Sequence, residues 1–495
     1  MGNLTYLDLN TNRFCGLIPH QLGNLSGLRY LDLGYNHLYA YNLHWMSSLS
    51  SIQYLNLSYA DLHTKVDWLQ IMSKFSSLSE LFLYYCQLDS LNPSLGFVNF
   101  TSIRIHHLSY NLFDHEIPNW LSNLTSLIQL GLTYNSLKGE IPPSIFNFQN
   151  LEYLTLGFNK LTGKIPESLG KLKRLMHLDL QGENHFQVTI PLWIGQMTSL
   201  RVLHLRSNGF KGHIPLQICQ LSSLMVLDLA NNSLLGPIPK CLNNISALKI
   251  PNTRDFVYFD NETLRYDWYV ENLVLVPKGN ELKYEETLRY VRIIDLSSNN
   301  LSGSIPIEIS LLLELRFLNL SRNQLVGKIL EKIGSMIGLE SIDFSRNHLS
   351  GKIPPSMSKL TFLCHLDLSY NNFLGRIPSS TQLQTFDALS YTGNPQLCGV
   401  PLAKNCTVDK EPSNRTPIGK TEDHSENYSF YMGSEVGFIV GFWAVCGVLF
   451  FKRNWRHAYL VFLDVIKDWV YVTIVVNVNC FLEKLRSCRR HHYLL

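Results

Sequence analysis

The sequence predicts an α/β-type solenoid of short parallel strands, and three observations support this prediction. A motif, Leu-x-x-Leu-x-Leu-x-x-Asn-x-Leu-x-Gly-x-Ile-Pro, recurs about fourteen times and is plainest at 151–166, 200–215, 224–239 and 339–354. Its asparagine returns every 24 to 26 residues over most of the chain. The 495 residues exceed what one compact core usually holds, but stacked coils escape that limit because each packs only on its neighbours. We therefore expect leucine-rich repeats, one coil per repeat.

Each coil is expected to begin with a short strand and to turn at the asparagine. In the Leu-x-Leu segment the leucines should point into the core and the x residues outward. The buried asparagine should satisfy the backbone groups of the turn that follows. This position is held in order by Asn12, Asn36, Ala60, Cys86, Asn111, Asn135, Asn159, Asn184, Asn208, Asn232, Asn299, Asn323, Asn347 and Asn371, with Cys86 expected as a buried thiol.

The repeat rhythm breaks once, because 67 positions separate Asn232 from Asn299. Residues 250–290 are therefore an insertion, here called the island, and their many aromatic residues predict that it folds back on the coils. We expect Tyr258, Tyr266, Trp268 and Tyr269 to take part in recognition. Repeats 1–10 then occupy 1–249, repeats 11–14 occupy 291–378, and a carboxyl cap occupies 379–406.

Beyond the cap, residues 407–428 form part of an acidic, polar stretch that predicts a solvated stalk. Residues 429–451 carry Glu435 as their only charge and would span about 34 Å as a helix, enough to cross a bilayer. Residues 452–495 are short and basic, so the positive-inside rule places them in the cytosol. The segment 458–482 is interrupted by charges and fits a helix lying on the inner leaflet better than a second span.

The predicted membrane helix carries a stripe of small residues. Gly433, Gly437 and Gly441 recur every four positions and would let another helix approach closely. At the other end of the chain, Met1 runs directly into a repeat, with no apolar signal segment and no cysteine-bearing cap. A translocated protein needs such a signal, so we expect the amino terminus to be truncated.

The cysteines and the N-glycosylation acceptors are consistent with an extracellular location for the part of the chain that precedes the predicted membrane helix. Cys398 and Cys406 are expected to form a disulfide that closes the cap, whereas pairing of Cys219 with Cys241 is left open. No cysteine or histidine spacing indicates a metal site. The Asn-x-Ser/Thr acceptors all precede residue 452, and they are Asn3, Asn24, Asn56, Asn99, Asn123, Asn231, Asn244, Asn261, Asn300, Asn319, Asn405, Asn414 and Asn427.

Catalysis is not expected, because the sequence has no phosphate-binding loop, kinase motif or nucleophile elbow. No cofactor and no nucleic-acid partner are indicated. The middle coils instead place unusual side chains at x positions, where we expect them to face solvent and bind a ligand. These candidates are Phe82, Tyr84, His107, Thr133, Tyr153, Thr155, His204 and Arg206.

Several motifs resemble plant leucine-rich-repeat receptor-like proteins, with repeats of the plant extracytoplasmic type. They are the repeat spelling at 301–306, the island end at 278–284, four repeats after the island, the cap spelling at 393–402, the acidic stalk and the glycine-containing segment 437–443. The tail motifs at 455–459 and 468–472 resemble the subgroup that contains receptors for a fungal ethylene-inducing xylanase.

This resemblance implies a kinase-less receptor at the plasma membrane, single-pass and type I, with its repeats outside the cell. It would recognise an extracellular ligand, expected to be a microbial protein or peptide, in plant defence. Through Gly437 and Gly441 it would pair with an adaptor receptor kinase, and it would recruit a somatic-embryogenesis-type coreceptor kinase. Alternatives are a developmental peptide co-receptor, a secreted-type inhibitor of cell-wall-degrading enzymes and a non-functional truncated paralogue.

Overall fold

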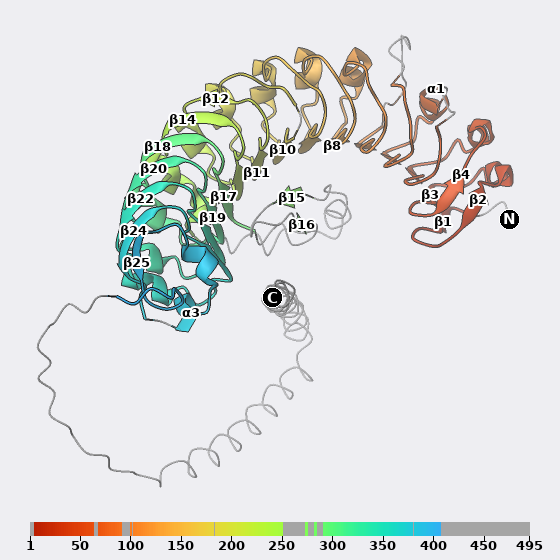
Figure 1. Ribbon diagram of the computed structural model, residues 1–495. Helices are drawn as coiled ribbons and strands as arrows, with labels where there is room; N and C mark the ends of the chain where they lie inside the picture. The colour runs from red at the N-terminus through yellow and green to blue at the C-terminus, as the bar shows by residue number, and fades with distance from the viewer. Residues whose placement is uncertain are drawn as a thin grey trace, which may run out of the picture. The chain divides into compact units, whose positions relative to one another are not determined.

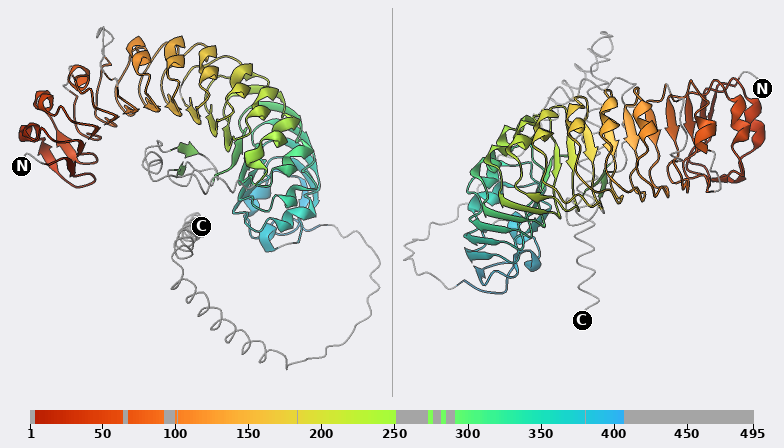
Figure 2. Two further views of the ribbon diagram at one scale, coloured as in Figure 1. Left: turned by 180° about the vertical axis from the view of Figure 1, so that it is seen from behind. Right: turned by 90° about the horizontal axis from the view of Figure 1, so that it is seen from above.

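The computed structural model describes residues 4–63, 68–91, 100, 102–182, 184–250, 273–275, 282–284, 291–379 and 381–406. A compact unit ends at Cys406, and residues 407–495 lie outside the described part. Within the unit, successive coils stack side by side, with strands on the inner, concave face and short helices on the outer face (Figures 1 and 2). The predicted solenoid of parallel strands is confirmed.

A single parallel sheet of fourteen strands lines the concave face of the described residues. Its strands, in spatial order, are β1 (Tyr6–Asp8), β3 (Tyr30–Asp32), β5 (Tyr54–Asn56), β6 (Glu80–Phe82), β7 (Ile105–His107), β8 (Gln129–Gly131), β9 (Tyr153–Thr155), β10 (His177–Asp179), β11 (Val202–His204), β13 (Val226–Asp228), β17 (Ile293–Asp295), β19 (Phe317–Asn319), β21 (Ser341–Asp343) and β23 (His365–Asp367).

The register of this sheet follows the leucines. Leu154 of β9 pairs with Leu130 on one side and Leu178 on the other, and all three are buried. The same motif position is stacked from coil to coil, so the leucines make one continuous core along the solenoid. This is the physical meaning of the repeat: each coil buries its leucines against those of its neighbours.

The buried asparagines bond as the sequence predicts. The side-chain amide of Asn159 donates to the carbonyl oxygens of Leu132, Leu156 and Gly157 at 2.9–3.1 Å. Its side-chain oxygen accepts the N–H of Leu137 at 3.0 Å. One side chain thus satisfies backbone groups of two coils, which explains why the motif needs an amide at this position.

A second set of strands lies beside the concave sheet, where the Leu-x-Gly part of the motif runs. Seven strands form one parallel sheet, and they are β12 (Lys211–Gly212), β14 (Ser233–Pro237), β18 (Asn300–Ser304), β20 (Gln324–Gly327), β22 (His348–Gly351), β24 (Asn372–Arg376) and β25 (Gln396–Cys398). A separate parallel pair is formed by β2 (Cys15–Leu17) and β4 (His37–Tyr39). The island contributes an antiparallel pair, β15 (Leu273–Leu275) and β16 (Leu282–Tyr284).

The outer face consists mainly of 3-10 helices rather than the α-helices implied by an α/β class. Most of them begin after the proline that ends the motif. They are η1 (His20–Asn24), η2 (His44–Ser48), η3 (Asn119–Asn123), η4 (Pro143–Asn147), η5 (Glu167–Lys171), η6 (Leu192–Gln196), η7 (Leu216–Gln220), η8 (Lys240–Asn244), η9 (Ser246–Leu248), η11 (Ile307–Leu311), η12 (Ile333–Ser335) and η13 (Pro355–Lys359), with two short α-helices, α1 (Trp68–Met72) and α3 (Thr381–Gln384). The helix η14 (Ala388–Tyr391) instead lies beside β23, where the N–H of Leu368 donates to the carbonyl oxygen of Ser390.

The concave sheet continues across the island without a break. Strand β13 pairs directly with β17, with Val226 opposite Ile293. The asparagine row is also continuous, because Asn299 donates to the carbonyl oxygen of Leu229 and accepts the N–H of Leu234, both at 3.0 Å. The insertion therefore leaves and re-enters the solenoid at one coil boundary.

The carboxyl cap adds one more member to the asparagine row, which the repeat motif did not predict. Asn394 donates to the carbonyl oxygens of Leu368 and Tyr391 and accepts the N–H of Phe373. The hydroxyl of buried Tyr391 donates to the carbonyl oxygen of Leu383 at 2.6 Å. The cap thus closes the core with a modified coil rather than an unrelated structure.

Candidate recognition surface

The concave face is formed by the side chains that alternate with the leucines. In β9, Leu154 is buried, while Tyr153 and Thr155 point to the opposite side of the strand. The eight predicted concave residues all lie in such strands or two residues beyond them: Phe82, Tyr84, His107, Thr133, Tyr153, Thr155, His204 and Arg206.

The expectation that these side chains face solvent is wrong for six of the eight. Phe82 is 1% exposed and His204 is 0% exposed, and four more are buried, namely Tyr84, His107, Thr133 and Thr155. Tyr153 is half-buried, and the Arg206 side chain is 17% exposed. The reason is that parallel strands lie about 4.8 Å apart, so each side chain on the face packs against its equivalents in the neighbouring coils.

An aromatic cluster shows this packing in the amino-terminal half. The rings of Tyr84 and His107 stack with centroids 5.5 Å apart, and Phe82 lies 6.1 Å from His107 and 5.3 Å from Tyr54. These rings hold adjacent coils together through their faces and edges. Their contribution is to the shape of the concave face rather than to direct capture of a ligand.

A charged network crosses four coils further along the face. Nε2 of His204 lies 3.1 Å from Oδ2 of Asp228, and its Nδ1 lies 3.6 Å from Oδ1 of Asp179. Nε of Arg206 donates to Oδ2 of Asp228 at 2.8 Å, and a terminal nitrogen of Arg206 donates to Asp295. Since Asp295 follows the island in sequence, Arg206 links the coils on the two sides of it.

The network shifts the pKa values of Asp228, Asp295 and Arg206. Burial opposes ionisation of Asp228, but Arg206 and His204 outweigh it and lower the pKa of Asp228 to about 2. Burial and the nearby Asp228 charge raise the pKa of Asp295 to about 6, although Arg206 acts in the opposite direction. Burial also opposes the charge of Arg206, yet the two carboxylates raise its pKa above the usual range. Arg206 is therefore always charged, and its guanidinium group is fixed in place by Asp228 and Asp295.

Sequence analysis missed a row of aromatic residues at the turn after each strand. Directly before the position of the buried asparagine, six successive coils carry Tyr35, Tyr59, Tyr85, Tyr110, Tyr134 and Phe158. Tyr35 and Tyr85 are each 50% exposed and Tyr59 is 40% exposed, more than any of the predicted concave aromatics. The pair Tyr-Asn recurs at 35–36, 110–111 and 134–135, and an aromatic residue at the same motif position could have indicated the others.

The acceptor asparagines differ in accessibility. Six are exposed, namely Asn24, Asn123, Asn231, Asn244, Asn300 and Asn405, and Asn319 is half-buried on β19. Asn56 is 1% exposed, and its side-chain oxygen accepts the N–H of Ser58 at 2.9 Å. Glycosylation of Asn56 is therefore incompatible with the fold, because a side chain buried against its neighbours leaves no room for an attached glycan.

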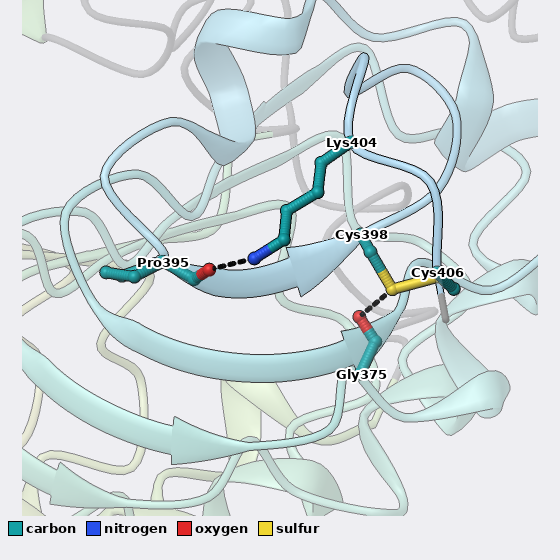
Figure 3. The surroundings of a disulfide bond; sticks show 5 residues. All are labelled: Gly375, Pro395, Cys398, Lys404 and Cys406. Carbon is teal, nitrogen blue, oxygen red and sulfur yellow. Dashed lines mark hydrogen bonds between the residues drawn. A yellow bond between two sulfur atoms is a disulfide. The ribbon is translucent and has the colours of Figure 1, made fainter. Parts of the chain in front are cut away.

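Two disulfides join described cysteines. Cys398 is bonded to Cys406 at the cap, where Sγ of Cys398 lies 3.3 Å from the carbonyl oxygen of Gly375 (Figure 3). Nearby, the ammonium group of Lys404 donates to the carbonyl oxygen of Pro395 at 2.6 Å. The second disulfide joins Cys219 to Cys241 in adjacent coils. The Cys219–Cys241 bond holds one coil against the next, whereas the Cys398–Cys406 bond closes a short loop within the cap.

Some predicted features lie outside the described residues. They are the island aromatics Tyr258, Tyr266, Trp268 and Tyr269, the glycines Gly433, Gly437 and Gly441, and the acceptors Asn3, Asn99, Asn261, Asn414 and Asn427. Among helices of the described part, none is both long and apolar enough to cross a bilayer. In the same part, no group of His, Cys, Asp and Glu side chains is arranged to hold a metal ion.

Comparison with protein families agrees with this architecture. A leucine-rich repeat region model matches residues 81–250, a leucine rich repeat model matches 2–62, and a third repeat model matches 290–312, 314–336, 338–360 and 362–383. The chain is a leucine-rich-repeat protein.

Among curated proteins, this chain resembles plant receptor-like proteins. It is 51% identical over 329 residues to Receptor-like protein EIX2 of Solanum lycopersicum, covering 63% of this chain and 31% of the relative. It is 53% identical over 228 residues to Receptor-like protein EIX1 of the same species, covering 45% of this chain and 22% of the relative. The chain thus spans less than a third of the length of either relative.

Solved structures show the same fold. The ectodomain of the Arabidopsis receptor kinase HAESA, in complex with an extended IDA peptide hormone, aligns with a TM-score of 0.62 and 27% identity, covering 82% of this chain and 64% of that chain. HAESA in complex with IDA and the co-receptor SERK1 aligns with a TM-score of 0.60 and 28% identity over the same shares.

Proposed function

We propose that this chain is a cell-surface receptor-like protein of plant defence, which recognises an extracellular protein or peptide and signals through receptor kinases that it binds. The observation that carries the proposal is the concave sheet, which continues from β13 to β17 although the island lies between them. Such a scaffold presents an inserted segment and a long inner face together. Its resemblance to EIX2 and EIX1 supports a receptor role.

A stack of coils suits recognition because its surface is fixed before the ligand arrives. Each coil is held to the next by strand pairing, asparagine bonds and the leucine core, so little conformational entropy is lost on binding. Arg206, held by Asp228 and Asp295, offers a preorganised cation on the face. HAESA, which shares the fold, has been solved with a peptide hormone and a co-receptor, which supports a peptide ligand and a coreceptor kinase for this chain.

Signalling would pass through the segment after the cap. Residues 429–451 are proposed to cross the membrane once, with Gly433, Gly437 and Gly441 forming the surface that pairs with an adaptor kinase. The tail at 452–495 carries no kinase motif, so phosphate transfer would come from the partners. The protein itself would act by binding and not by catalysis.

Affinity purification of the full chain from plant membranes tests this function. A receptor kinase should copurify with the parent, and Gly437→Leu with Gly441→Leu should reduce its recovery because two larger side chains separate the helices. Gly447→Leu is the matched control, since it changes a glycine of the same segment that is off the stripe. Equal kinase recovery from the double variant and the parent would contradict pairing through this stripe.

A further inference from the structure

The aromatic row at the strand-to-loop turn has a backbone conformation that bulky residues usually avoid. We call Tyr35, Tyr59, Tyr85, Tyr110, Tyr134 and Phe158 the aromatic ladder. Their φ angles are all positive, from 48° at Phe158 to 67° at Tyr59. In this left-handed region a large side chain is disfavoured, whereas asparagine and glycine are accepted at low cost.

The fold itself does not demand aromatic residues at this turn. The equivalent position is Ser207, Asn231 and Ser298 in later coils, with φ angles of 52° to 56°. These coils form the same strand as the ladder coils and the same asparagine bonds as the coil of Asn159. The aromatic residues at this position in six successive coils are therefore not required by the turn. We attribute them to a role of the surface that they form.

The ladder has a tight half and an open half. Tyr110, Tyr134 and Phe158 stack almost face to face, with centroid separations of 4.2 and 4.0 Å. From Tyr35 to Tyr59 and from Tyr59 to Tyr85 the separations are 5.0 Å, and from Tyr85 to Tyr110 the separation is 6.3 Å. In the open half the rings are tilted by 28–45° and the side chains of the first three are 40–50% exposed. Part of each ring face in this half is accessible to a partner.

The sequence around the open half has more acids than bases. Residues 30–91 contain five acids and two bases, although Asp32 is buried and the carboxylate of Asp61 lies 2.6 Å from Nδ1 of His63. Asp61 and Asp89 follow the ladder residues Tyr59 and Tyr85 within their own coils, and the carboxylate of Asp61 is 39% exposed. An acidic surface with accessible aromatic rings attracts cationic side chains, both by charge and by the negative face of each ring.

The same turn position already holds a cation on a ring elsewhere in the chain. The guanidinium carbon of Arg346 lies 4.4 Å from the centroid of the Tyr370 ring, one coil further on. Both residues occupy the positive-φ position that the ladder residues occupy. The geometry of this turn therefore allows an arginine to sit on a neighbouring aromatic ring.

We propose that the open half of the aromatic ladder binds an arginine-containing, extended segment of a partner protein, which lies along the solenoid beside the concave sheet. This inference rests on the proposed function, because it assigns part of ligand or coreceptor recognition to Tyr35, Tyr59 and Tyr85. An extended segment rises about 3.3 Å per residue, so alternate side chains recur about every 6.6 Å. Successive rings from Tyr35 to Tyr85 are 5.0 Å apart, so an arginine would contact the edge or face of one ring without matching every ring in turn.

Glycans should leave this surface open. In the coils that carry the ladder, the exposed acceptor among described residues is Asn123, at the end of η3 on the outer face. Asn24 ends η1 in the same way one coil before the row begins. Neither lies at the turn that carries the rings.

The test measures binding of synthetic peptides to the purified full chain. The probe alternates arginine with serine over about eight residues, which spans about 26 Å when extended. Matched probes replace arginine by lysine or by glutamate, and xylohexaose tests for sugar binding. The main variant combines Tyr35→Asn, Tyr59→Asn and Tyr85→Asn, because asparagine suits positive φ and occurs natively at Asn231. Tyr370→Asn is the control, with the same change at the same turn position outside the ladder.

The arginine probe should bind the parent better than the lysine probe, and the glutamate probe should not bind. The triple variant should lose about tenfold or more in affinity for the arginine probe, while Tyr370→Asn should stay within about twofold of the parent. If the triple variant unfolds, Tyr59→Asn alone decides, with an expected loss of about threefold.

Equal affinity of parent and triple variant would overturn the proposal, and so would equal binding of the glutamate probe. Loss of xylohexaose binding instead of arginine-probe binding would make the ladder a sugar-binding surface. No kinase is present in this assay. Failure of the arginine probe to bind would therefore not contradict the receptor function. Failure of a kinase to copurify would likewise not contradict binding of the arginine probe.

Discussion

The carboxyl-terminal coils at 291–378 and the amino-terminal coils at 49–135 share one fold but differ in how closely they follow the repeat motif. In the carboxyl-terminal coils every position of the asparagine row is asparagine. A second strand accompanies each of these coils, from β18 to β24. Among described residues of the amino-terminal coils there is no second-sheet strand, only an isolated bridge between Glu116 and Lys138 and one between Tyr39 and Asp61. Ala60 and Cys86 replace asparagine there.

The difference shows which positions stabilise the solenoid and which are available for recognition. The motif residues of the carboxyl-terminal coils satisfy backbone groups and fill the core. The amino-terminal coils lack some of these stabilising groups, yet they carry two of the three exposed tyrosines of the aromatic ladder, Tyr59 and Tyr85. The third, Tyr35, lies in the coil just before this region. We infer that the regular coils support the fold, while the irregular ones provide the binding surface.

The largest effect should come from removing a regular asparagine. Asn347 donates to the carbonyl oxygens of Leu320, Phe344 and Ser345 and accepts the N–H of Leu325. Asn347→Ala leaves these buried groups unpaired and should lower the free energy of unfolding by about 3 kcal/mol, as measured by denaturant unfolding.

Cys86→Ala provides the comparison for that variant. The Cys86 thiol makes one short contact, to the carbonyl oxygen of Leu57 at 3.2 Å, so its loss should cost about 1 kcal/mol. A cost for Cys86→Ala equal to that for Asn347→Ala would remove the distinction between the two regions.

A second effect concerns His106, which occupies a leucine position of the core. It is 0% exposed and neither ring nitrogen has a hydrogen-bond partner among the described residues. Burial, and to a smaller extent the neighbouring His107, lower the pKa of His106 to about 3. The unfolded chain binds this proton near pH 6.5 and the folded chain does not, so stability falls as the pH drops below 6.5.

Because of His106, we expect the free energy of unfolding to fall by about 2 kcal/mol when the pH is lowered from 7 to 5. His106→Leu should abolish that part of the pH dependence and raise stability at both values. The difference in unfolding free energy between parent and variant, measured across this range, isolates the contribution of His106. A difference that does not change with pH would show that His106 is protonated in the folded state.

A smaller gain should follow from restoring the motif. Cys86→Asn places an amide where the following coil has Asn111, next to the carbonyl oxygens of Leu57 and Tyr84. Stability should rise by about 1 kcal/mol, visible as a higher denaturant midpoint with an unchanged slope. A drop in stability would indicate that this coil has diverged too far to accept the regular residue.

The smallest effect on stability should come from excising the island. Deleting 252–288 should leave the solenoid folded, because β13 and β17 already pair and Asn299 already bonds to Leu229 and Leu234. The melting temperature of the solenoid should change little, while the response to ligand should fall. A deletion variant that unfolds would show that the island is part of the scaffold, and one with full response would make it unnecessary for recognition.

The repeat motif was sufficient to predict the coils, because leucine and asparagine have one physical role wherever they recur. Asn394 was missed because the cap replaces the leucine motif around it with Tyr391 and Leu383. The burial of Phe82 and His204 could not be predicted, since it depends on side chains 24 to 28 residues away that lie beside them on neighbouring coils. The ladder tyrosines were overlooked because the motif marks their position as variable.

Hydrogen exchange of backbone amides in the full chain tests most directly whether regular coils support the fold while irregular coils give up stability at the binding surface. We expect the strands of the carboxyl-terminal coils, such as β21 and its companion β22, to exchange more slowly than β6 and β7, where Cys86 and His106 weaken the core. Slower exchange at β6 and β7 than at β21 and β22 would contradict the account, because the departures from the motif would then stabilise the solenoid rather than serve recognition.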